Sequence, residues 1–515
     1  MTKLILKIIR AIDTRIALIV LLGLFQQYVI WAQLETSTWI FGYGVGLDFS
    51  TGKPVVFNDS KIHTTEGCAC ISDANGNLLF YTDGITVWNR NNEVMPNGFQ
   101  LNGHISSTQS VVIVPRPGSD SQYYIFTLDW EAEVKGFSQS IVDMSKAAGM
   151  GDVVMKNKFI KKHCTERIVA VKHANNCDLW IIIHEFNSDA FCAYLLTEDG
   201  LSEQPVVSNI GIKHEKSRFN TIGYMKISMD KNRLAVAITG DALVQIFDFD
   251  NETGVLTNPR TLKFPEGSNP YGIEFSPDNH YMYLGLESKG FVYQIDNSKS
   301  TEQELKTSMK LIGKNKDYLG AFQLAVDGRI YIADYNKNSL SVIDKPDERE
   351  NSCGLRFNAI DLGNEICQFG LPTFQHELVR VYDFAARPLK FSRRSKAEVN
   401  RKYILNNVYF DFNEVLYKKT SMPELKHLMV ILKKNENLKI EITGHTDSIG
   451  TKEYNDRLSL SRARQVGMFL RLKGISEDRI TCYGKGCAEP VATNKTDEGR
   501  QENRRVEFLL TKETE

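Results

Sequence analysis

Residues Tyr224–Val236 read YMKISMDKNRLAV, and similar patterns recur at Tyr271–Tyr283 (YGIEFSPDNHYMY) and Phe322–Ile332 (FQLAVDGRIYI). Each stretch has β-branched and aromatic residues on both sides of an Asp-led turn, which predicts two strands joined by a tight turn. The turn aspartates of successive stretches are 48 and 49 residues apart. This spacing indicates an internal repeat of one supersecondary unit.

Each repeat continues into a third apolar run, namely Val244–Phe249 (VQIFDF), Phe291–Asp296 (FVYQID) and Ser339–Asp344 (SLSVID). A multistranded repeat of this length is typical of a β-propeller, whose blades bury their faces against their neighbours. Short strand-like runs extend over residues 33–375, which predicts an all-β propeller of about seven blades. The first blades fit the pattern less well, and a pair of two-sheet sandwiches is the alternative.

The first 32 residues have the pattern of an export signal. Lys3 and Lys7 precede an apolar stretch from Ile16 to Val29, and Ala32 offers a small residue for cleavage. The apolar stretch is shorter than the roughly 20 residues of a spanning helix. We therefore expect a signal peptide over residues 1–32 and an exported protein in the periplasm, with an uncleaved anchor as the alternative.

The formal net charge of −1 gives no overall attraction to a polyanion, so nucleic acid is not an expected partner. The nine cysteines are an odd number. Cys68 and Cys70 lie too close for an easy mutual bridge, so the expected local disulfides are Cys353 with Cys367 or Cys482 with Cys487. Buried free thiols are the alternative, and the spacings lack the paired CxxC form of a zinc site.

Composition changes after the repeats. Residues 376–402 carry a surplus of basic side chains, which predicts a basic linker or a small extra strand pair. The remaining elements are predicted as a strand at Val408–Phe410, helices over Ser421–Lys434 and 453–473, and strands at Leu438–Thr443, Ile480–Tyr483 and Arg505–Leu510. Residues 403–515 are therefore predicted as an α+β sandwich domain.

Several motifs follow one another in this domain: Gly444-His445-Thr446-Asp447, Gly450, Tyr454-Asn455, Leu458-Ser459, Arg462-Ala463, Asn494, Gly499-Arg500 and Asn503-Arg504-Arg505-Val506. In this order and spacing they resemble the OmpA C-terminal family, which includes peptidoglycan-associated lipoproteins and flagellar stator wall-binding domains. The resemblance implies binding of peptidoglycan through the free end of its diaminopimelate residue, where one carbon carries an ammonium and a carboxylate.

The resemblance also assigns ligand-binding roles. Asp447 matches the family aspartate that takes the ammonium, and Arg462 matches the arginine that grips the carboxylate with a planar fork. Asn455 and Arg505 match positions lining the same pocket, and Asp411 and Asn413 are expected rim contacts. The alternative is that Asp447 and Arg462 simply pair with each other.

We expect no catalytic residue, metal ligand or cofactor, because Gly-x-Ser-x-Gly and His-Glu-x-x-His are both absent. The stretch Trp39–Pro54 (WIFGYGVGLDFSTGKP) resembles the propeller region of envelope proteins from gliding-type Gram-negative bacteria, which implies a binding or secretion-linked role. Two hypotheses remain. One is a wall-anchored scaffold associated with the outer membrane, whose propeller binds a protein or glycan partner. The other is a wall-anchored enzyme with a glycan-cleaving or lactonase-like site in the propeller channel.

Overall fold

The computed structural model describes residues 34–50, 52–74, 76–379, 389–391, 399, 402–405, 422–491, 494 and 497–512. They form two compact units, one up to residue 379 and one from residue 389 onward. The predicted signal peptide, the strand expected at Val408–Phe410 and most of the basic linker lie outside the described residues.

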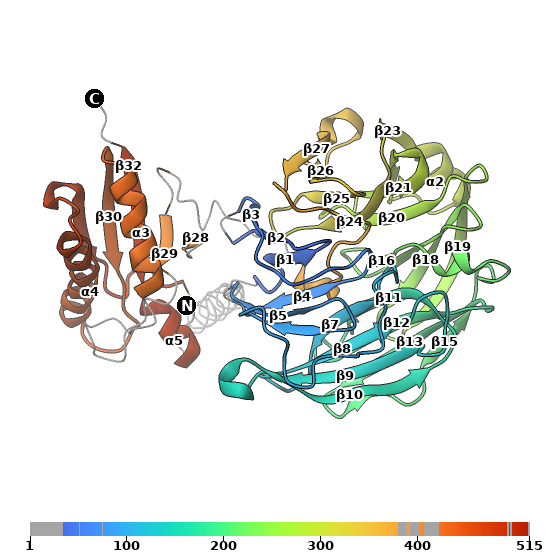
Figure 1. Ribbon diagram of the computed structural model, residues 1–515, viewed down its shortest axis with the longest axis horizontal. Helices are drawn as coiled ribbons and strands as arrows, with labels where there is room; N and C mark the ends of the chain where they lie inside the picture. The colour runs from blue at the N-terminus through green and yellow to red at the C-terminus, as the bar shows by residue number, and fades with distance from the viewer. Residues whose placement is uncertain are drawn as a thin grey trace, which may run out of the picture. The chain divides into compact units, whose positions relative to one another are not determined.

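The described part of the first unit contains seven antiparallel sheets, which we number as blades 1 to 7 in chain order (Figure 1). Blade 1 contains β1 (Thr38–Phe41), β2 (Val45–Asp48) and β3 (Val55–Phe57), and blade 2 contains β4 (Ala69–Ser72), β5 (Leu78–Thr82) and β6 (Val87–Asn89). Blade 3 contains β7 (Val111–Pro115), β8 (Gln122–Leu128), β9 (Phe137–Asp143) and β10 (Asp152–Lys161). Blade 4 contains β11 (Cys164–Lys172), β12 (Leu179–Glu185), β13 (Ala190–Thr197), β14 (Gly200–Leu201) and β15 (Val206–Asn209).

The repeats identified in the sequence form the last three blades. Blade 5 contains β16 (Met225–Ile227), β17 (Arg233–Ile238), β18 (Leu243–Asp250) and β19 (Val255–Lys263). Blade 6 contains β20 (Pro270–Phe275), β21 (Tyr281–Leu286), β22 (Phe291–Asp296) and β23 (Lys310–Lys314), with helix α2 (Glu302–Ser308) before its last strand. Blade 7 contains β24 (Leu319–Leu324), β25 (Ile330–Asp334), β26 (Ser339–Ile343) and β27 (Leu355–Asp361). The propeller prediction is confirmed, and the sandwich alternative is wrong.

The Asp-led turns of the three repeats have one local geometry. Asp230, Asp278 and Asp327 each accept a hydrogen bond on Oδ1 from the backbone N–H two residues later, at 3.2, 2.9 and 3.1 Å. In the third turn Gly328 has φ +81°, a conformation that glycine adopts without steric penalty. This side-chain bond to the backbone is why Asp recurs in the turns of these three blades.

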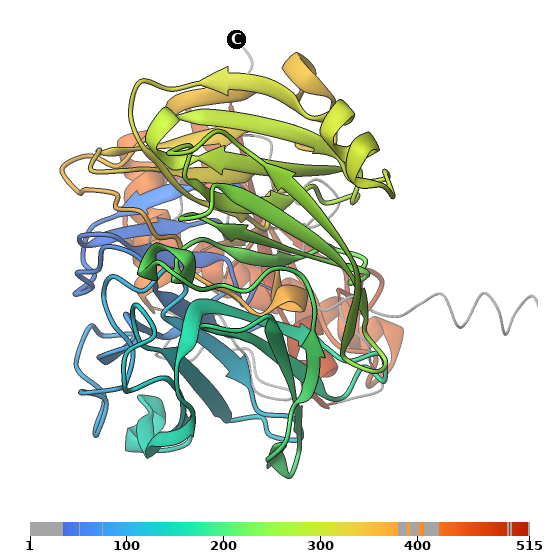
Figure 2. The same cartoon turned by 90° about the vertical axis from the view of Figure 1, so that its right-hand side faces the viewer.

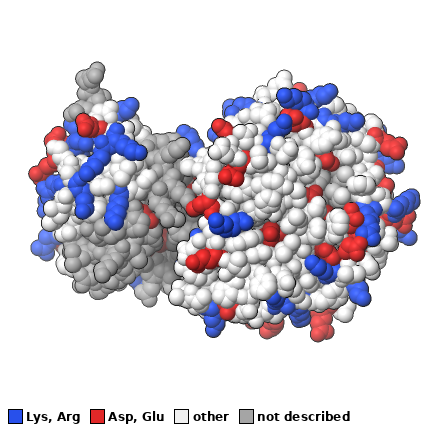
Figure 3. All heavy atoms as spheres, viewed as in Figure 1, with Lys and Arg blue, Asp and Glu red and all other residues white. Residues whose placement is uncertain are grey.

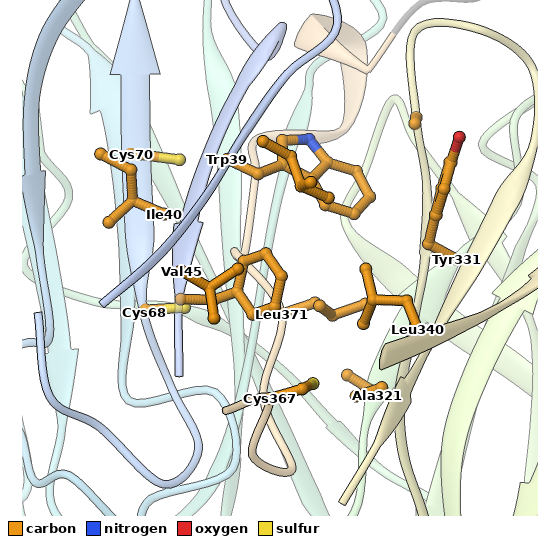
Figure 4. Close-up of a cluster of buried hydrophobic side chains, with 14 of the residues drawn as sticks. Trp39, Ile40, Val45, Cys68, Cys70, Ala321, Tyr331, Leu340, Cys367 and Leu371 are labelled. Carbon is orange, nitrogen blue, oxygen red and sulfur yellow. The ribbon is translucent and has the colours of Figure 1, made fainter. Parts of the chain in front are cut away.

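The chain closes the ring with a segment near the propeller axis, residues 366–378, which we call the axial segment. Tyr43 N–H donates to the Ile366 carbonyl at 3.0 Å, and Thr373 N–H donates to the Cys68 carbonyl at 2.8 Å. Figures 1 and 2 show the first sheet (blue) beside the last sheet (gold). In Figure 4, Leu371 lies between side chains of these two blades. The ring is thus closed by packing and hydrogen bonds from both ends of the unit.

The second unit is a mixed five-stranded sheet in the order β28-β29-β32-β30-β31. Its strands are β28 (Leu389–Phe391), β29 (Lys402–Leu405), β30 (Leu438–Gly444), β31 (Ile480–Gly484) and β32 (Val506–Lys512). Its helices are α3 (Met422–Lys434), α4 (Lys452–Leu472) and α5 (Asp497–Asn503). The predicted α+β class is confirmed. β28 and β29 pair in parallel; β28 lies in the segment predicted as a basic linker, and β29 begins at its last residue.

All nine cysteines lie in described residues, and all nine are free. The proposed Cys353–Cys367 and Cys482–Cys487 disulfides are therefore wrong. Six of the thiols are buried, including Cys353 and Cys367, and they act as small apolar core residues.

Candidate functional site

The loop after β30 carries the aspartate predicted to bind the ligand. β30 approaches α4 closely at Gly444, where an added Cβ would lie 2.0 Å from the Ser459 carbonyl oxygen. His445 N–H donates to the Arg505 carbonyl, and Thr446 N–H donates to the Gly486 carbonyl, both at 2.9 Å. These bonds hold the loop at the end of the sheet against the first turns of α4, and so bring Asp447 toward the helix that carries Arg462.

Asp447 is nearly fully buried, with 3% of its surface exposed. Its Oδ1 accepts a hydrogen bond from Ile449 N–H at 3.0 Å, which fixes the turn. Its Oδ2 accepts a hydrogen bond from Arg504 Nη1 at 2.6 Å, within a buried ion pair. The carboxylate of the predicted ammonium site is therefore engaged by a guanidinium of the same domain.

Arg462 lies on α4 and is fully buried. Its Nη1 donates to the His445 carbonyl at 3.3 Å. Burial lowers the pKa of Arg462 to about 10; the charge of Arg504 lowers it as well, whereas that of Asp447 raises it. The structure thus brings Asp447, Arg462 and Arg504 into one buried cluster of two guanidinium groups and one carboxylate.

Of the other predicted ligand contacts, Asn455 is buried on the first turn of α4. Arg505 faces a different partner, because its Nε and Nη2 donate to Glu507 Oε1 at 2.8 and 2.6 Å. Although burial alone would raise the pKa of Glu507, hydrogen bonding from His445 and the charge of Arg505 lower it to about 2. Asp411 and Asn413 lie outside the described residues.

Arg504 is the site residue that the sequence analysis did not single out. Arg504 and Arg505 both precede β32, and the structure gives them different partners: Arg504 contacts Asp447, whereas Arg505 contacts Glu507. The motif Asn503-Arg504-Arg505-Val506 contains both arginines, and the pattern of the sequence did not tell which of them reaches Asp447. Helix α5, which ends directly before Arg504, is held by residues of the recognised motifs: Arg500 Nη1 donates to the Asn494 carbonyl at 2.9 Å, and Asn503 Nδ2 donates to Asn494 Oδ1 at 3.0 Å.

The propeller axis is crossed by side chains as well as by the axial segment. Glu66, before β4, accepts a hydrogen bond from the Tyr271 hydroxyl of β20 at 2.8 Å, although these residues belong to blades 2 and 6. Glu166 on β11 accepts hydrogen bonds from Thr108 N–H at 2.8 Å and from the Thr221 hydroxyl at 3.2 Å. Burial, and then the charge of Glu166, raise the pKa of Glu66 well above its ordinary value. These acids link blades across and around the axis.

A cavity of about 40 Å³ remains beside the axial segment. Lys226 Nζ on its wall lies 2.8 Å from Glu274 Oε2 and donates to Gln323 Oε1 at 2.6 Å. His376 and Phe374 of the axial segment line the same space. A cavity of this size holds a few water molecules at most.

In the part of the chain that the structure describes, no helix is both long and apolar enough to cross a membrane. On the face of the propeller unit visible in Figure 3, acidic and basic side chains are interspersed.

Comparisons with known proteins agree with the two units. Residues 409–504 match the model of the OmpA family, and residues 178–351 match the model of the lactonase family of seven-bladed β-propellers. Outer membrane protein A of Bordetella avium is 40% identical over 123 residues, which are 23% of this chain and 61% of that protein. The peptidoglycan-associated lipoprotein of Buchnera aphidicola is 38% identical over 100 residues, which are 19% of this chain and 58% of that protein.

Among solved structures, the peptidoglycan-associated lipoprotein from Burkholderia pseudomallei is 31% identical, with a TM-score of 0.20, over 20% of this chain and 88% of that one. The chain spans 61% or less of the length of the curated relatives it matches first. The resemblance stated from the motifs is confirmed. The chain carries an OmpA family domain at its C-terminus, preceded by a β-propeller of the seven-bladed lactonase type.

Proposed function

We propose that this chain is a non-catalytic cell-envelope protein that binds peptidoglycan through its C-terminal domain and uses its propeller as an interaction platform. The proposed organisation is a signal peptide over residues 1–32, a propeller over 33–375, a basic linker over 376–402 and a wall-binding domain over 403–515. The proposed location is the periplasm, in association with the outer membrane.

The observation that carries the wall-binding proposal is the buried cluster of Asp447, Arg462 and Arg504. A ligand carbon with both an ammonium and a carboxylate presents one charge for Asp447 and one for a guanidinium fork. Diaminopimelate in the peptidoglycan stem has such an end. In this scheme the ligand ammonium replaces Arg504 at Asp447, and Arg462 holds the ligand carboxylate. A relative named peptidoglycan-associated lipoprotein supports the same ligand class.

The platform proposal rests on where exposed apolar side chains occur in the propeller unit. Ile105, Trp130, Val134 and Phe219 are all exposed, and Val134 reaches 73%. The loop of Trp130 and Val134 contacts the segment of Phe219, since Arg218 forms ion pairs with Glu131 and Glu133. The same loop contacts the neighbour of Ile105, because His104 stacks on Trp130. Exposed apolar side chains gathered in neighbouring segments are typical of a binding face.

The second candidate, an enzyme with its site in the channel, draws support from the match to the lactonase family of propellers. Against it stands the occupancy of the axis by residues 366–378 and by the Glu66–Tyr271 hydrogen bond. A sugar ring or a lactone needs more room than the 40 Å³ beside the axial segment. The scaffold is therefore the function we favour.

The test is sedimentation of the full chain with purified sacculi. Asp447→Ala and Arg462→Ala should abolish binding, because each variant leaves one charge of the ligand unpaired. Desolvating an unpaired charge costs several kcal/mol of binding free energy. Arg464→Ala is the matched control, since Arg464 lies on an exposed face of the same helix. Arg462→Lys should also bind weakly, because an ammonium lacks the planar fork. Free diaminopimelate should compete with sacculi. Undiminished binding by folded Asp447→Ala and Arg462→Lys proteins would refute the proposal.

A further inference from the structure

The outer edge of blade 3 carries an unusual combination of side chains. β10 is the last strand of its sheet and lies at the lower rim of the propeller unit in Figure 1. Val154 and Phe159 on this strand are 47% and 46% exposed. Lys156 and Lys158 are also exposed on the same strand, and Lys162 follows it directly.

A neighbouring loop adds two more apolar side chains to this edge. Residues 93–102 run along β10: Val153 N–H donates to the Pro96 carbonyl at 3.1 Å, and Asn157 Nδ2 donates to the Gln100 carbonyl at 2.8 Å. This contact sets Val94 and Phe99, which are 51% and 53% exposed, beside the strand. We call the exposed side of β10 together with Val94 and Phe99 of this loop the blade 3 edge.

Cations are interleaved with these apolar groups. Lys156 Nζ donates to the Phe99 carbonyl at 3.0 Å and lies 5.0 Å from the centre of the Phe99 ring. β10 and the residue after it contain four lysines and one acid, Asp152. Lys161 is paired with Glu185 at 2.7 Å, which leaves three exposed lysines on the edge. Lysines around exposed aromatic rings can keep their charges in water while the rings enter an apolar phase.

Addition of a peptide strand to this edge is disfavoured. The pairing of β10 with β9 shifts register between Val153 and Met155, between Met155 and Lys158, and between Phe159 and Lys161. Bulges twist an edge strand and interrupt the row of hydrogen-bonding groups that an added strand would need. The exposed apolar side chains thus fit a partner that does not require backbone pairing.

We infer that the blade 3 edge is a membrane-contact surface that binds peripherally to an anionic phospholipid bilayer. Phe99, Phe159 and their valine neighbours insert at the boundary between headgroups and acyl chains, and Lys156 and Lys158 contact lipid phosphates. This inference goes beyond wall binding, and its test contains no peptidoglycan. The membrane-contact inference and the wall-binding proposal can therefore fail independently.

The test is cosedimentation with vesicles, using the chain from Gln33 onward, which contains every described residue. We expect binding to vesicles of phosphatidylethanolamine and phosphatidylglycerol, weaker binding at high salt, and little binding to phosphatidylcholine alone. Phe99→Ser with Phe159→Ser, and separately Lys156→Gln with Lys158→Gln, should each weaken binding about tenfold. The control is Tyr318→Ser, at an aromatic residue of 48% exposure before β24 in blade 7, which should bind like the wild type.

A second readout reports insertion directly. Tryptophan emission of a Phe99→Trp variant should shift to shorter wavelength when anionic vesicles are added, whereas that of a Tyr318→Trp variant should not. Absence of wild-type binding to anionic vesicles would overturn the inference. Equal binding to phosphatidylcholine, or equal losses of binding in the Tyr318→Ser control and the edge variants, would overturn it too.

Discussion

Arg504 Nη1 lies 2.6 Å from Oδ2 of Asp447, and both side chains are largely buried, at 13% and 4% exposure. The residue expected to receive a ligand ammonium is thus already neutralised from within the domain. Loss of either partner should therefore affect both folding and binding, but in different proportions.

We predict that Asp447→Ala destabilises the C-terminal domain by about 3 kcal/mol, because it leaves Arg504 and Arg462 buried without this counter-ion. Asp447→Ala with Arg504→Ala should recover part of that loss. Arg504→Ala alone should retain sacculus binding at least as strong as the wild type, because the ligand ammonium no longer competes with a guanidinium. Urea unfolding measures the stability of each variant, and sedimentation with sacculi measures its binding. Loss of binding in Arg504→Ala would show that this guanidinium holds the ligand.

Closure of the propeller should depend on Gly370. An added Cβ there would lie 1.7 Å from the Glu66 carbonyl oxygen, a backbone atom that cannot move aside cheaply. We expect Gly370→Ala to destabilise the propeller by about 3 kcal/mol or to prevent its folding, since overpacking a closed core costs this order of free energy. Gly267→Ala is the control: nothing lies within 4 Å of its added Cβ, and only its φ of +72° opposes the change. Equal thermal midpoints for the two variants would contradict this account of closure.

Propeller stability should fall at acid pH because of a buried histidine pair. His184 and His214 stack at 3.6 Å between ring centres, and His214 Nδ1 lies 3.3 Å from Arg167 Nη1. Burial, together with the charge of Arg167, lowers the pKa of both histidines well below the ordinary value. The unfolded chain therefore binds more protons than the folded one below about pH 6.5. In that range each histidine lowers the free energy of unfolding by up to about 1.4 kcal/mol for each pH unit of acidification.

Above about pH 7.5 these groups contribute no pH dependence, because both states are then neutral. His184→Phe should reduce the loss of stability between pH 7 and pH 5, as measured by urea midpoints. An unaltered pH profile in His184→Phe would exclude this histidine as the cause.

Thiol reactivity should separate one cysteine from the rest. Cys177 is exposed, whereas Cys70 and Cys192 are buried, and burial raises the pKa of each to about 12. Since the thiolate is the reactive form, Cys177 should react first with a colorimetric disulfide reagent under native conditions. All nine thiols should react in denaturant, and Cys177→Ser should remove the fast phase. A total of fewer than nine in denaturant would indicate a disulfide.

Much of the architecture could be predicted because it depends on short-range patterns. The Asp-led turns set the blade period, since each aspartate binds a backbone N–H only two residues away. Helices α3 and α4 were recognisable for the same reason, because an apolar stripe and a start signal lie within one segment. Such features require no knowledge of where the rest of the chain goes.

The sequence by itself thus determined the propeller, the α+β domain and the candidate pair Asp447 and Arg462. Only the tertiary structure decided that Arg504, not Arg505, meets Asp447, that residues 366–378 fill the propeller axis, and that the cysteines remain unpaired. These outcomes depend on contacts between residues far apart in the chain. Periodicity and spacing report local conformation and burial, whereas the partner of a buried charge or thiol is set by which distant segment the closed fold brings against it.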